Sequence, residues 1–173
     1  MKRTDTTEQH ERGASLVEFA LVLPILAAFL LGTLSAGLAY NRNNSLNNAA
    51  RESARYAATL PVDGSMSAWL TSVAAVAESA ASGDLDDGVA GQYVCVAYVH
   101  PDGTDADDQT TRLTETAGVQ STAVGSTCFT DGRPDSERRV QIQVQRDTDI
   151  EVVLFSSTVT LDGESVVRFE RAD

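Results

Sequence analysis

An uncharged apolar segment near the amino terminus constrains this chain more than any other feature. No Asp, Glu, Lys or Arg occurs from Phe19 through Asn41. A helix needs about 20 apolar residues to cross a bilayer, and this segment is long enough. The segment therefore predicts a membrane helix over 14–40 and points away from a soluble enzyme. Pro24 lies inside it, and membrane helices tolerate proline better than soluble helices do.

A short polar leader, 1–13, precedes the membrane segment and ends at Gly13. Cleavage after Gly13 would expose a new amino group on Ala14, with Glu18 about one helical turn away. Because a carboxylate at the start of a membrane helix is costly without a partner, we expect Glu18 to pair with the terminal amine of an adjacent subunit. The alternative is an interfacial Glu18 that reaches the lipid headgroups beside Arg12.

The negative charge is concentrated in the second part of the chain. The whole chain carries a net charge of −12, and residues 61–173 hold 20 acids against 7 arginines. A surface this acidic repels phosphate backbones, so we expect no nucleic-acid partner. The same charge disfavours a head that lies flat on anionic lipid.

The two cysteines, Cys95 and Cys128, both follow the membrane segment. If this part of the chain lies outside the cytoplasm, a disulfide between them is the default expectation. Such a bridge would stabilise the fold by on the order of 3–4 kcal/mol in the loop-entropy description. The alternative is a pair of buried, unpaired thiols.

Helical spacing resumes after an asparagine-rich stretch, Asn41–Asn48. Small or apolar residues recur every three or four positions and predict an amphipathic stem over 41–60, which Pro61 ends. The stripe consists of Leu46, Ala49, Ala50, Ser53, Ala57 and Leu60. We expect this stem to continue the membrane helix.

The acidic head, 61–173, has the pattern of an α+β fold. Ser65 or Ser67 caps a second helix that Gly83 ends, and Tyr93–Val99 is a strand buried on both faces. Further strands are expected at Val140–Gln145, Ile150–Phe155, Ser157–Leu161 and Ser165–Phe169, with a hairpin turn at Asp162-Gly163 and a long loop over 102–136. The second helix then packs on a small, mainly antiparallel sheet.

Motifs for catalysis or cofactor binding do not occur in the sequence. The chain has two histidines, His10 and His100, and no HExxH, GxSxG, Walker or GxGxxG pattern. We expect no enzyme activity, no cofactor and no small-molecule substrate. Calcium binding by a cluster of acids is the alternative considered, but the spacing does not fit an EF-hand loop. The cluster consists of Asp102, Asp105, Asp107 and Asp108.

Three segments resemble one known family. GASLVEFALVLP at residues 13–24 resembles the amino-terminal signature of TadE-like proteins, which are minor pilins or pseudopilins of tight-adherence (Flp-type) pilus systems. AARESARYAA at residues 49–58 resembles the helix that follows the membrane segment in that family. The ending, over 158–170, is similar to the family's closing hairpin. The region 61–150 carries no resemblance.

The resemblance implies a structural subunit for pilus assembly and cell adhesion. A prepilin peptidase would cleave between Gly13 and Ala14, and Glu18, Phe19 and Pro24 would serve assembly. The expected partners are the lipid bilayer, the peptidase, other pilin-like subunits and membrane proteins of pilus assembly. The expected location is the cytoplasmic (inner) membrane, crossed once, with the carboxy-terminal head extracytoplasmic and the subunit incorporated into an extracellular pilus.

Two other interpretations remain open from the sequence. The first is a single-pass, signal-anchored binding or sensor protein that is neither processed nor assembled and does not need Glu18. The second is a secreted domain cut after Ala39. The length of the apolar segment speaks against the second interpretation, because signal peptides have shorter apolar regions.

Overall fold

The computed structural model describes residues 5–62, 64–100, 109–134, 136–152 and 155–169, without the side chains of 5–14, 152 and 155. The chain forms two compact units. The first unit holds residues 1–38 and 149–157, and the second holds 39–148 and 158–173. Each unit is described by itself below.

One helix, α1, extends from Asp5 to Thr59. It continues through Pro24 and through the asparagine-rich stretch, so the predicted membrane helix and stem form one element. Its start differs from the prediction, because α1 begins inside the polar leader rather than at Ala14. Glu8 and Arg12 are four residues apart in that leader, a spacing of opposite charges that favours helix.

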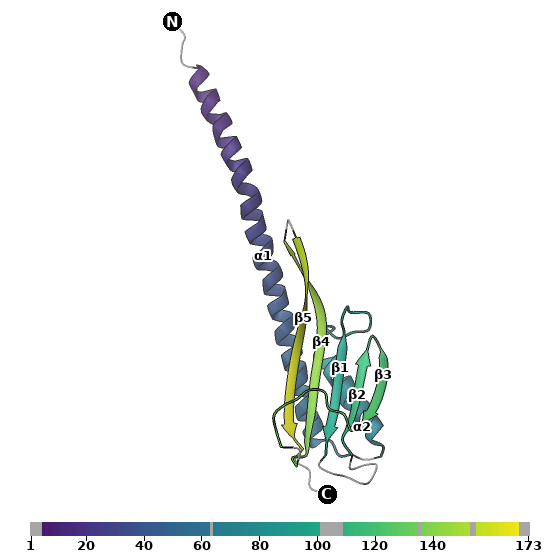
Figure 1. The fold of residues 1–173 in the computed structure, drawn as a ribbon. Coiled ribbons are helices and arrows are strands. Elements are labelled where there is room, and N and C mark those ends of the chain that lie inside the picture. The colour runs from purple at the N-terminus through teal and green to yellow at the C-terminus, as the bar shows by residue number, and fades with distance from the viewer. Residues whose placement is uncertain (1–4, 63, 101–108, 135, 153–154, 170–173) are drawn as a thin grey trace. The chain divides into compact units, whose positions relative to one another are not determined.

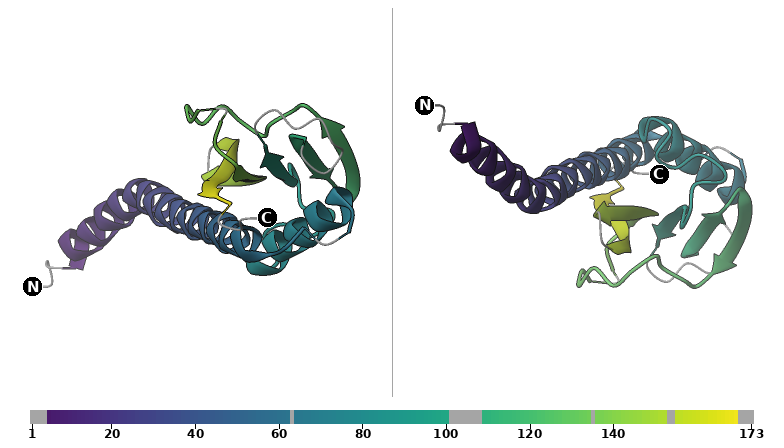
Figure 2. Two further views of the ribbon diagram at one scale, coloured as in Figure 1. Left: turned by 90° about the horizontal axis from the view of Figure 1, so that it is seen from below. Right: turned by 90° about the horizontal axis from the view of Figure 1, so that it is seen from above.

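The second unit has its core between two helices and one face of a sheet (Figure 2). The predicted stem stripe is confirmed, since Leu46, Ala49 and Ala57 of α1 are fully buried. They pack with the apolar face of α2, Met66–Ala80, and with the sheet. The α2 and sheet residues of this core include Trp69, Leu70, Val73, Ala77, Val94, Val96, Leu113, Val140, Ile142 and Val144.

Local signals mark both ends of α2. The Ser65 side chain accepts a hydrogen bond from the Ala68 N–H, which satisfies one free donor of the first turn. After the helix, Ser82 and Gly83 both have positive φ angles, 53° and 91°. The helix ends at Ala80 with Ala81 as its C-cap, and this left-handed backbone follows, so the observed end lies three residues before the predicted Gly83.

Five strands form one sheet in the order β3-β2-β1-β4-β5 (Figure 1). Their bounds are Tyr93–Val99 for β1, Thr111–Thr116 for β2, Val119–Val124 for β3, Arg139–Val152 for β4 and Phe155–Arg168 for β5. The central strand β1 pairs antiparallel with β2, from Tyr93↔Thr116, and with β4, from Tyr93↔Gln145. The predicted α+β class and the buried central strand are confirmed.

The expected loop over 102–136 is wrong for its middle part, which forms the β2–β3 hairpin. The two strands pair antiparallel from Thr116↔Val119, with Ala117 and Gly118 as the turn. Both turn residues have positive φ angles, 49° and 76°, which the tight two-residue turn of a hairpin requires. The threonine-rich composition concealed the strands, although threonine is itself a good strand former.

The expected hairpin at Asp162-Gly163 is also wrong. β5 continues through both residues. The predicted Ile150–Phe155 strand is divided between β4, which ends at Val152, and β5, which begins at Phe155. Gly163 does not serve a turn. It is buried, and a Cβ atom there would lie 2.7 Å from the carbonyl carbon of Leu46. The glycine therefore allows β5 to lie directly against the α1 backbone.

Candidate functional site

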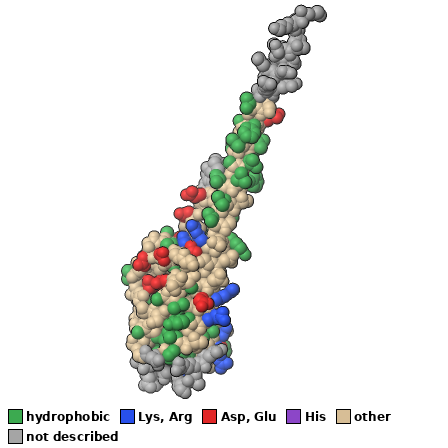
Figure 3. All heavy atoms as spheres, turned by 180° about the vertical axis from the view of Figure 1, so that it is seen from behind, with side chains coloured by type: hydrophobic (Ala, Val, Ile, Leu, Met, Phe, Trp, Pro, Cys, Tyr) green, Lys and Arg blue, Asp and Glu red, His purple; other side chains and the backbone are tan. Residues whose placement is uncertain are grey.

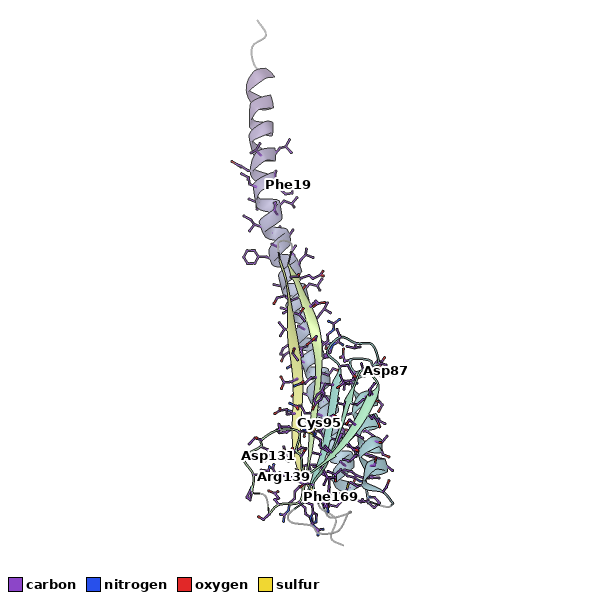
Figure 4. All side chains as sticks on the ribbon, turned by 45° about the vertical axis from the view of Figure 1, so that its right-hand side comes forward. Phe19, Asp87, Cys95, Asp131, Arg139 and Phe169 are labelled. Atoms are coloured by element: carbon purple, nitrogen blue, oxygen red, sulfur yellow. A yellow bond between two sulfur atoms is a disulfide. The ribbon has the colours of Figure 1, made fainter. Side chains whose placement is uncertain are left out.

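The apolar first part of α1 is the segment with the clearest functional signature. Its large apolar side chains are exposed around the whole helix, and Phe19 is 61% exposed and points outward (Figure 4). They are Leu16, Val17, Phe19, Leu21, Val22, Leu23, Ile25, Leu26, Phe29, Leu30, Leu31, Leu34 and Leu38. A helix that packed on a core would be apolar on one face only, so this pattern is typical of a helix surrounded by lipid or by other helices.

By length and composition, α1 can cross a membrane. It is the one helix with this property among the residues that the structure describes. Figure 3 shows its apolar side chains without a cover of charged groups along this part of the helix. This agrees with the predicted single membrane helix near the amino terminus, while the bounds 14–40 stay a prediction.

The residues predicted for processing and assembly all belong to α1. Gly13 and Ala14 are inside the helix, and their side chains are outside the described residues. Glu18 and Pro24 are exposed, with Glu18 one helical turn beyond Ala14. The exposed Glu18 carboxylate precedes the uncharged segment and is therefore available to a group outside its own helix.

A disulfide joins Cys95 of β1 to Cys128, as the sequence predicts, with the two Cα atoms 5.9 Å apart. Cys128 belongs to the segment between β3 and β4, whose described residues, 125–134 and 136–138, form no helix or strand. The bridge therefore fastens this segment to the central strand of the sheet.

A buried ion pair also holds the segment between β3 and β4 against the sheet (Figure 4). Arg139 of β4 donates from Nε to Asp131 Oδ2 at 2.7 Å and from Nη2 to Oδ1 at 3.2 Å. The two side chains are 4% and 6% exposed. Gln141 Nε2 also donates to Asp131, at 2.9 Å, and its Oε1 accepts from the Cys128 N–H at 3.0 Å. Gln141 is consequently buried, although the alternating pattern of β4 predicts a half-exposed strand.

The environment of Asp131 favours its charged form. Burial alone would raise the pKa of this carboxyl. Hydrogen bonds from Gln141, from the Arg133 N–H and from Arg139, together with the positive charge of Arg139, outweigh burial and hold the pKa below its ordinary value. Each side-chain nitrogen of Arg139 and each carboxylate oxygen of Asp131 makes at least one hydrogen bond, so the pair has a structural role.

Two carboxyl groups meet between α2 and β2. Burial, followed by a hydrogen bond to Glu115 and by its negative charge, raises the pKa of Glu78 to about 7. The charges of Asp87 and Asp86 act in the same direction. Glu115 accepts a hydrogen bond from Gln120 Nε2 at 2.6 Å. We expect this acid pair to make the stability of the head depend on pH. No sequence pattern indicated the pair, because its members come from distant segments.

The described part of the chain contains no cluster of side chains that could bind a metal ion. No group of three or more His, Cys, Asp or Glu side chains is arranged there to hold a metal. The acidic cluster considered for calcium, Asp102, Asp105, Asp107 and Asp108, lies outside the described residues.

The comparisons with known proteins concern α1 alone. Residues 13–55 match the family described as TadE-like protein, which confirms the predicted resemblance for the membrane segment and the stem. No curated protein and no solved structure matches the chain. The similarity to the TadE-like family therefore covers residues 13–55 and leaves the rest of the chain without a match.

Proposed function

We propose that this protein is a minor pilin or pseudopilin, a structural subunit for assembly of a tight-adherence pilus. The observation that carries the proposal is the TadE-like match over residues 13–55, which begins at the glycine before the predicted cleavage site. A prepilin peptidase cleaves between Gly13 and Ala14. The mature subunit then begins with a free amino group at the start of its apolar helix.

The exposed apolar surface of α1 supports an assembly role. Before assembly the bilayer covers this surface, and in the fibre the equivalent helices of neighbouring subunits replace the lipid. The Glu18 carboxylate pairs with the Ala14 amine of a neighbour, which offsets the cost of a charge at the edge of the apolar segment. The acidic head lies outside the cytoplasmic membrane and contributes to adhesion, and the chain has no catalytic activity of its own.

The first experiment is the intact mass and amino-terminal sequence of the protein purified from membranes. A start at Ala14 is expected. A start at Met1 would leave an unprocessed membrane anchor, and the signal-anchored binding or sensor protein would then be the better interpretation.

The second experiment separates assembly from membrane insertion. Glu18→Gln keeps the shape of the side chain and removes its charge, so we expect normal insertion and loss of crosslinking to other pilin-like subunits. Glu52→Gln is the matched control, because Glu52 is an exposed acid of the same helix beyond the apolar segment. Unchanged crosslinking in Glu18→Gln would contradict the assembly role of Glu18.

A further inference from the structure

One exposed stripe of α1 carries positive charge. Asn44, Asn48, Arg51 and Arg55 follow one another at steps of four, three and four residues, so they lie on one side of the helix. All four residues are exposed, and together they are called the arginine stripe below. Neither arginine makes an ion pair with any residue that the structure describes.

The two positive charges of the arginine stripe are unfavourable in an isolated subunit. Arg51 and Arg55 are four residues apart, and like charges at this spacing repel each other on a helix. Glu52 is the neighbouring acid in the sequence, but it lies about 100° around the helix from Arg51. Arginine is also enriched at protein–protein interfaces. The stripe therefore has the properties of a surface that binds an acidic partner.

The distance of the stripe from the membrane excludes lipid headgroups as this partner. The predicted membrane helix ends at Tyr40, so Arg51 and Arg55 lie about 16 and 22 Å further along α1. The headgroup layer on one side of a bilayer is only about 5–8 Å thick. The net charge of −12 on the chain disfavours nucleic acid. The partner is therefore an acidic protein surface.

The head itself carries an acidic surface after the end of α2. Asp86 and Asp87, called the acidic turn below, are adjacent and exposed, and neither makes an ion pair with a described residue. Asp84 of the same segment, by contrast, is paired with Arg146 at 2.6 Å. Burial is the largest cause of the raised pKa of Glu78, and the charges of Asp87 and Asp86 add to it. The negative charge of the acidic turn is thus not compensated within the head.

The acidic turn and the arginine stripe are offset along α1. The Ser45 hydroxyl donates to the Ala81 carbonyl at 3.0 Å, so the segment that carries the acidic turn starts level with Ser45. Arg51 and Arg55 follow Ser45 by six and ten residues, which is about 9 and 15 Å along the helix. On the face shown in Figure 3, acidic side chains of the head gather at the upper left and arginines at the lower right.

We infer that the arginine stripe binds the acidic turn of a second copy of this chain that is displaced by about 9–15 Å along the helix axis. Each copy offers its stripe to one neighbour and its acidic turn to another, so the contact is heterologous. Repeated contacts of this type build an open helical filament when they do not close into a ring. The inference rests on the proposed assembly role, and it assigns the surfaces by which the heads join outside the membrane.

Cysteine crosslinking of two populations of the full chain tests this contact. Both native cysteines are held in the disulfide, so the added cysteines are the reactive ones. One population carries Asn48→Cys in the stripe. The other carries Ser82→Cys, next to Gly83, where a Cβ atom would lie 3.4 Å from the Asp86 carboxylate. The populations are mixed in a non-ionic detergent, which does not hold their helices at one height as a bilayer does, and are treated with a short bismaleimide.

We expect a crosslink between positions 48 and 82 of different copies. It should weaken in 1 M salt, where the Debye length is about 3 Å. The pair Ser121→Cys and Ser82→Cys is the control for random collision, because Ser121 is an exposed residue of β3, and it should give little product. Equal yields from the two pairs, or a yield that salt does not change, would overturn the inference.

Charge reversal identifies the groups that carry the contact. Arg51→Glu combined with Arg55→Glu in both populations should lower the crosslink yield about tenfold, because like charges then face each other. Asp86→Arg combined with Asp87→Arg in both populations should do the same. When the stripe is reversed only in the Asn48→Cys population and the acidic turn only in the Ser82→Cys population, opposite charges meet again and the yield should recover.

A matched control keeps the net charge change and moves it elsewhere. Arg133→Glu combined with Arg168→Glu changes two exposed arginines outside the stripe, and the yield should stay near that of the unchanged chain. Circular dichroism of each variant verifies that the head is folded. Reversals without effect, or folded variants whose yield does not recover on mixing, would exclude the pairing of stripe and acidic turn.

The outcome is separable from that of the proposed function. A mature protein that begins at Ala14 but gives no charge-dependent crosslink between positions 48 and 82 would overturn this inference and leave the pilin role intact. A crosslink from position 48 to a different pilin-like subunit in cell membranes, without one to a second copy, would also exclude the second copy as the partner. A protein that begins at Met1 would contradict the pilin role whatever the crosslink yield.

Discussion

Gly163 of β5 lies against the backbone of Leu46 in α1, so closely that a Cβ atom on the glycine would be 2.7 Å from both the carbonyl carbon and the carbonyl oxygen of Leu46. Backbone atoms cannot move aside as the end of a flexible side chain can. The strand and the helix are therefore in contact because position 163 has no side chain.

Gly163→Ala should destabilise the head by about 1–3 kcal/mol, because the added methyl group forces β5 away from α1. Chemical denaturation of the full chain in detergent, followed by circular dichroism, measures the change. Asp162→Ala is the control, since Asp162 is an exposed neighbour on the same strand, and its effect should be small. Equal effects of the two substitutions would show that the close approach is not required.

Reduction of the Cys95–Cys128 disulfide should lower the free energy of unfolding by on the order of 3–4 kcal/mol. The bridge limits the conformations of the unfolded chain, and in the folded protein it joins the segment between β3 and β4 to β1. Denaturation with and without a reducing agent measures the loss. A protein with both cysteines replaced by alanine should not respond to the reducing agent, and a similar response in that protein would exclude the disulfide as the cause.

Asp131→Ala should be costly, by about 3–5 kcal/mol, because it leaves the Arg139 guanidinium buried without its carboxylate. Glu137→Ala is a matched comparison in the same segment. It breaks the pair with Arg133, whose side chain is 40% exposed, and should cost less than about 1 kcal/mol. Urea denaturation distinguishes the two, and similar losses would contradict the assigned difference in burial.

The same pair predicts a loss of stability in acid. The pKa of Asp131 is lowered in the folded state, so the unfolded chain binds more protons below the ordinary carboxyl pKa of 3.8. The contribution of Asp131 is complete above that value and is lost as the pH falls through the lower, folded-state pKa. This part of the acid sensitivity should be absent from Asp131→Asn.

The Glu78–Glu115 pair predicts the opposite slope at higher pH. The pKa of Glu78 rises from 4.5 to about 7 in the folded state, so the folded protein binds more protons between these values. Stability therefore falls as the pH rises from 4.5 to 7. We expect the free energy of unfolding to fall by on the order of 1 kcal/mol over this pH range. This is less than the full pKa shift of Glu78 would give, because water screens the charge of a partly exposed group.

Glu78→Gln tests this slope, because the amide cannot ionise and the loss of stability between pH 4.5 and 7 should disappear. Thermal unfolding at a series of pH values measures it. Glu164→Gln is the control, since Glu164 is exposed and accepts one hydrogen bond, from Gln143. An unchanged slope in Glu78→Gln would assign the pH dependence to other groups.

Local sequence signals predicted those parts of the fold that depend on neighbours along the chain. The uncharged run after Glu18 predicted a membrane-length helix, the Leu46–Leu60 spacing predicted the buried stripe, and Ser65 with Gly83 predicted the ends of α2 to within three residues. Each signal acts within one or two helical turns, through periodic burial, capping or a left-handed backbone.

Two predictions, the hairpin turn at Asp162-Gly163 and the loop over 102–136, were wrong because contacts with distant residues decided the structure there. Asp162-Gly163 has the composition of a hairpin turn, yet the glycine is required by the approach of α1. β2, with its three threonines, and β3, with Gln120, Ser121 and Thr122, have a loop-like composition. β2 nevertheless pairs with β1, and β3 pairs with β2 through the Ala117-Gly118 turn, so both are strands.

The sequence by itself determined the membrane-length apolar helix, the TadE-like resemblance at 13–24 and 49–58 and the α+β class of the head, because these follow from composition, periodicity and short contiguous motifs. Only the tertiary structure decided which distant groups meet. Gly163 contacts Leu46, Asp131 pairs with Arg139, Glu78 with Glu115, and Ser35 binds Glu151. These four contacts form when the strands and helices pack together, and a pattern within one segment of the sequence cannot predict them.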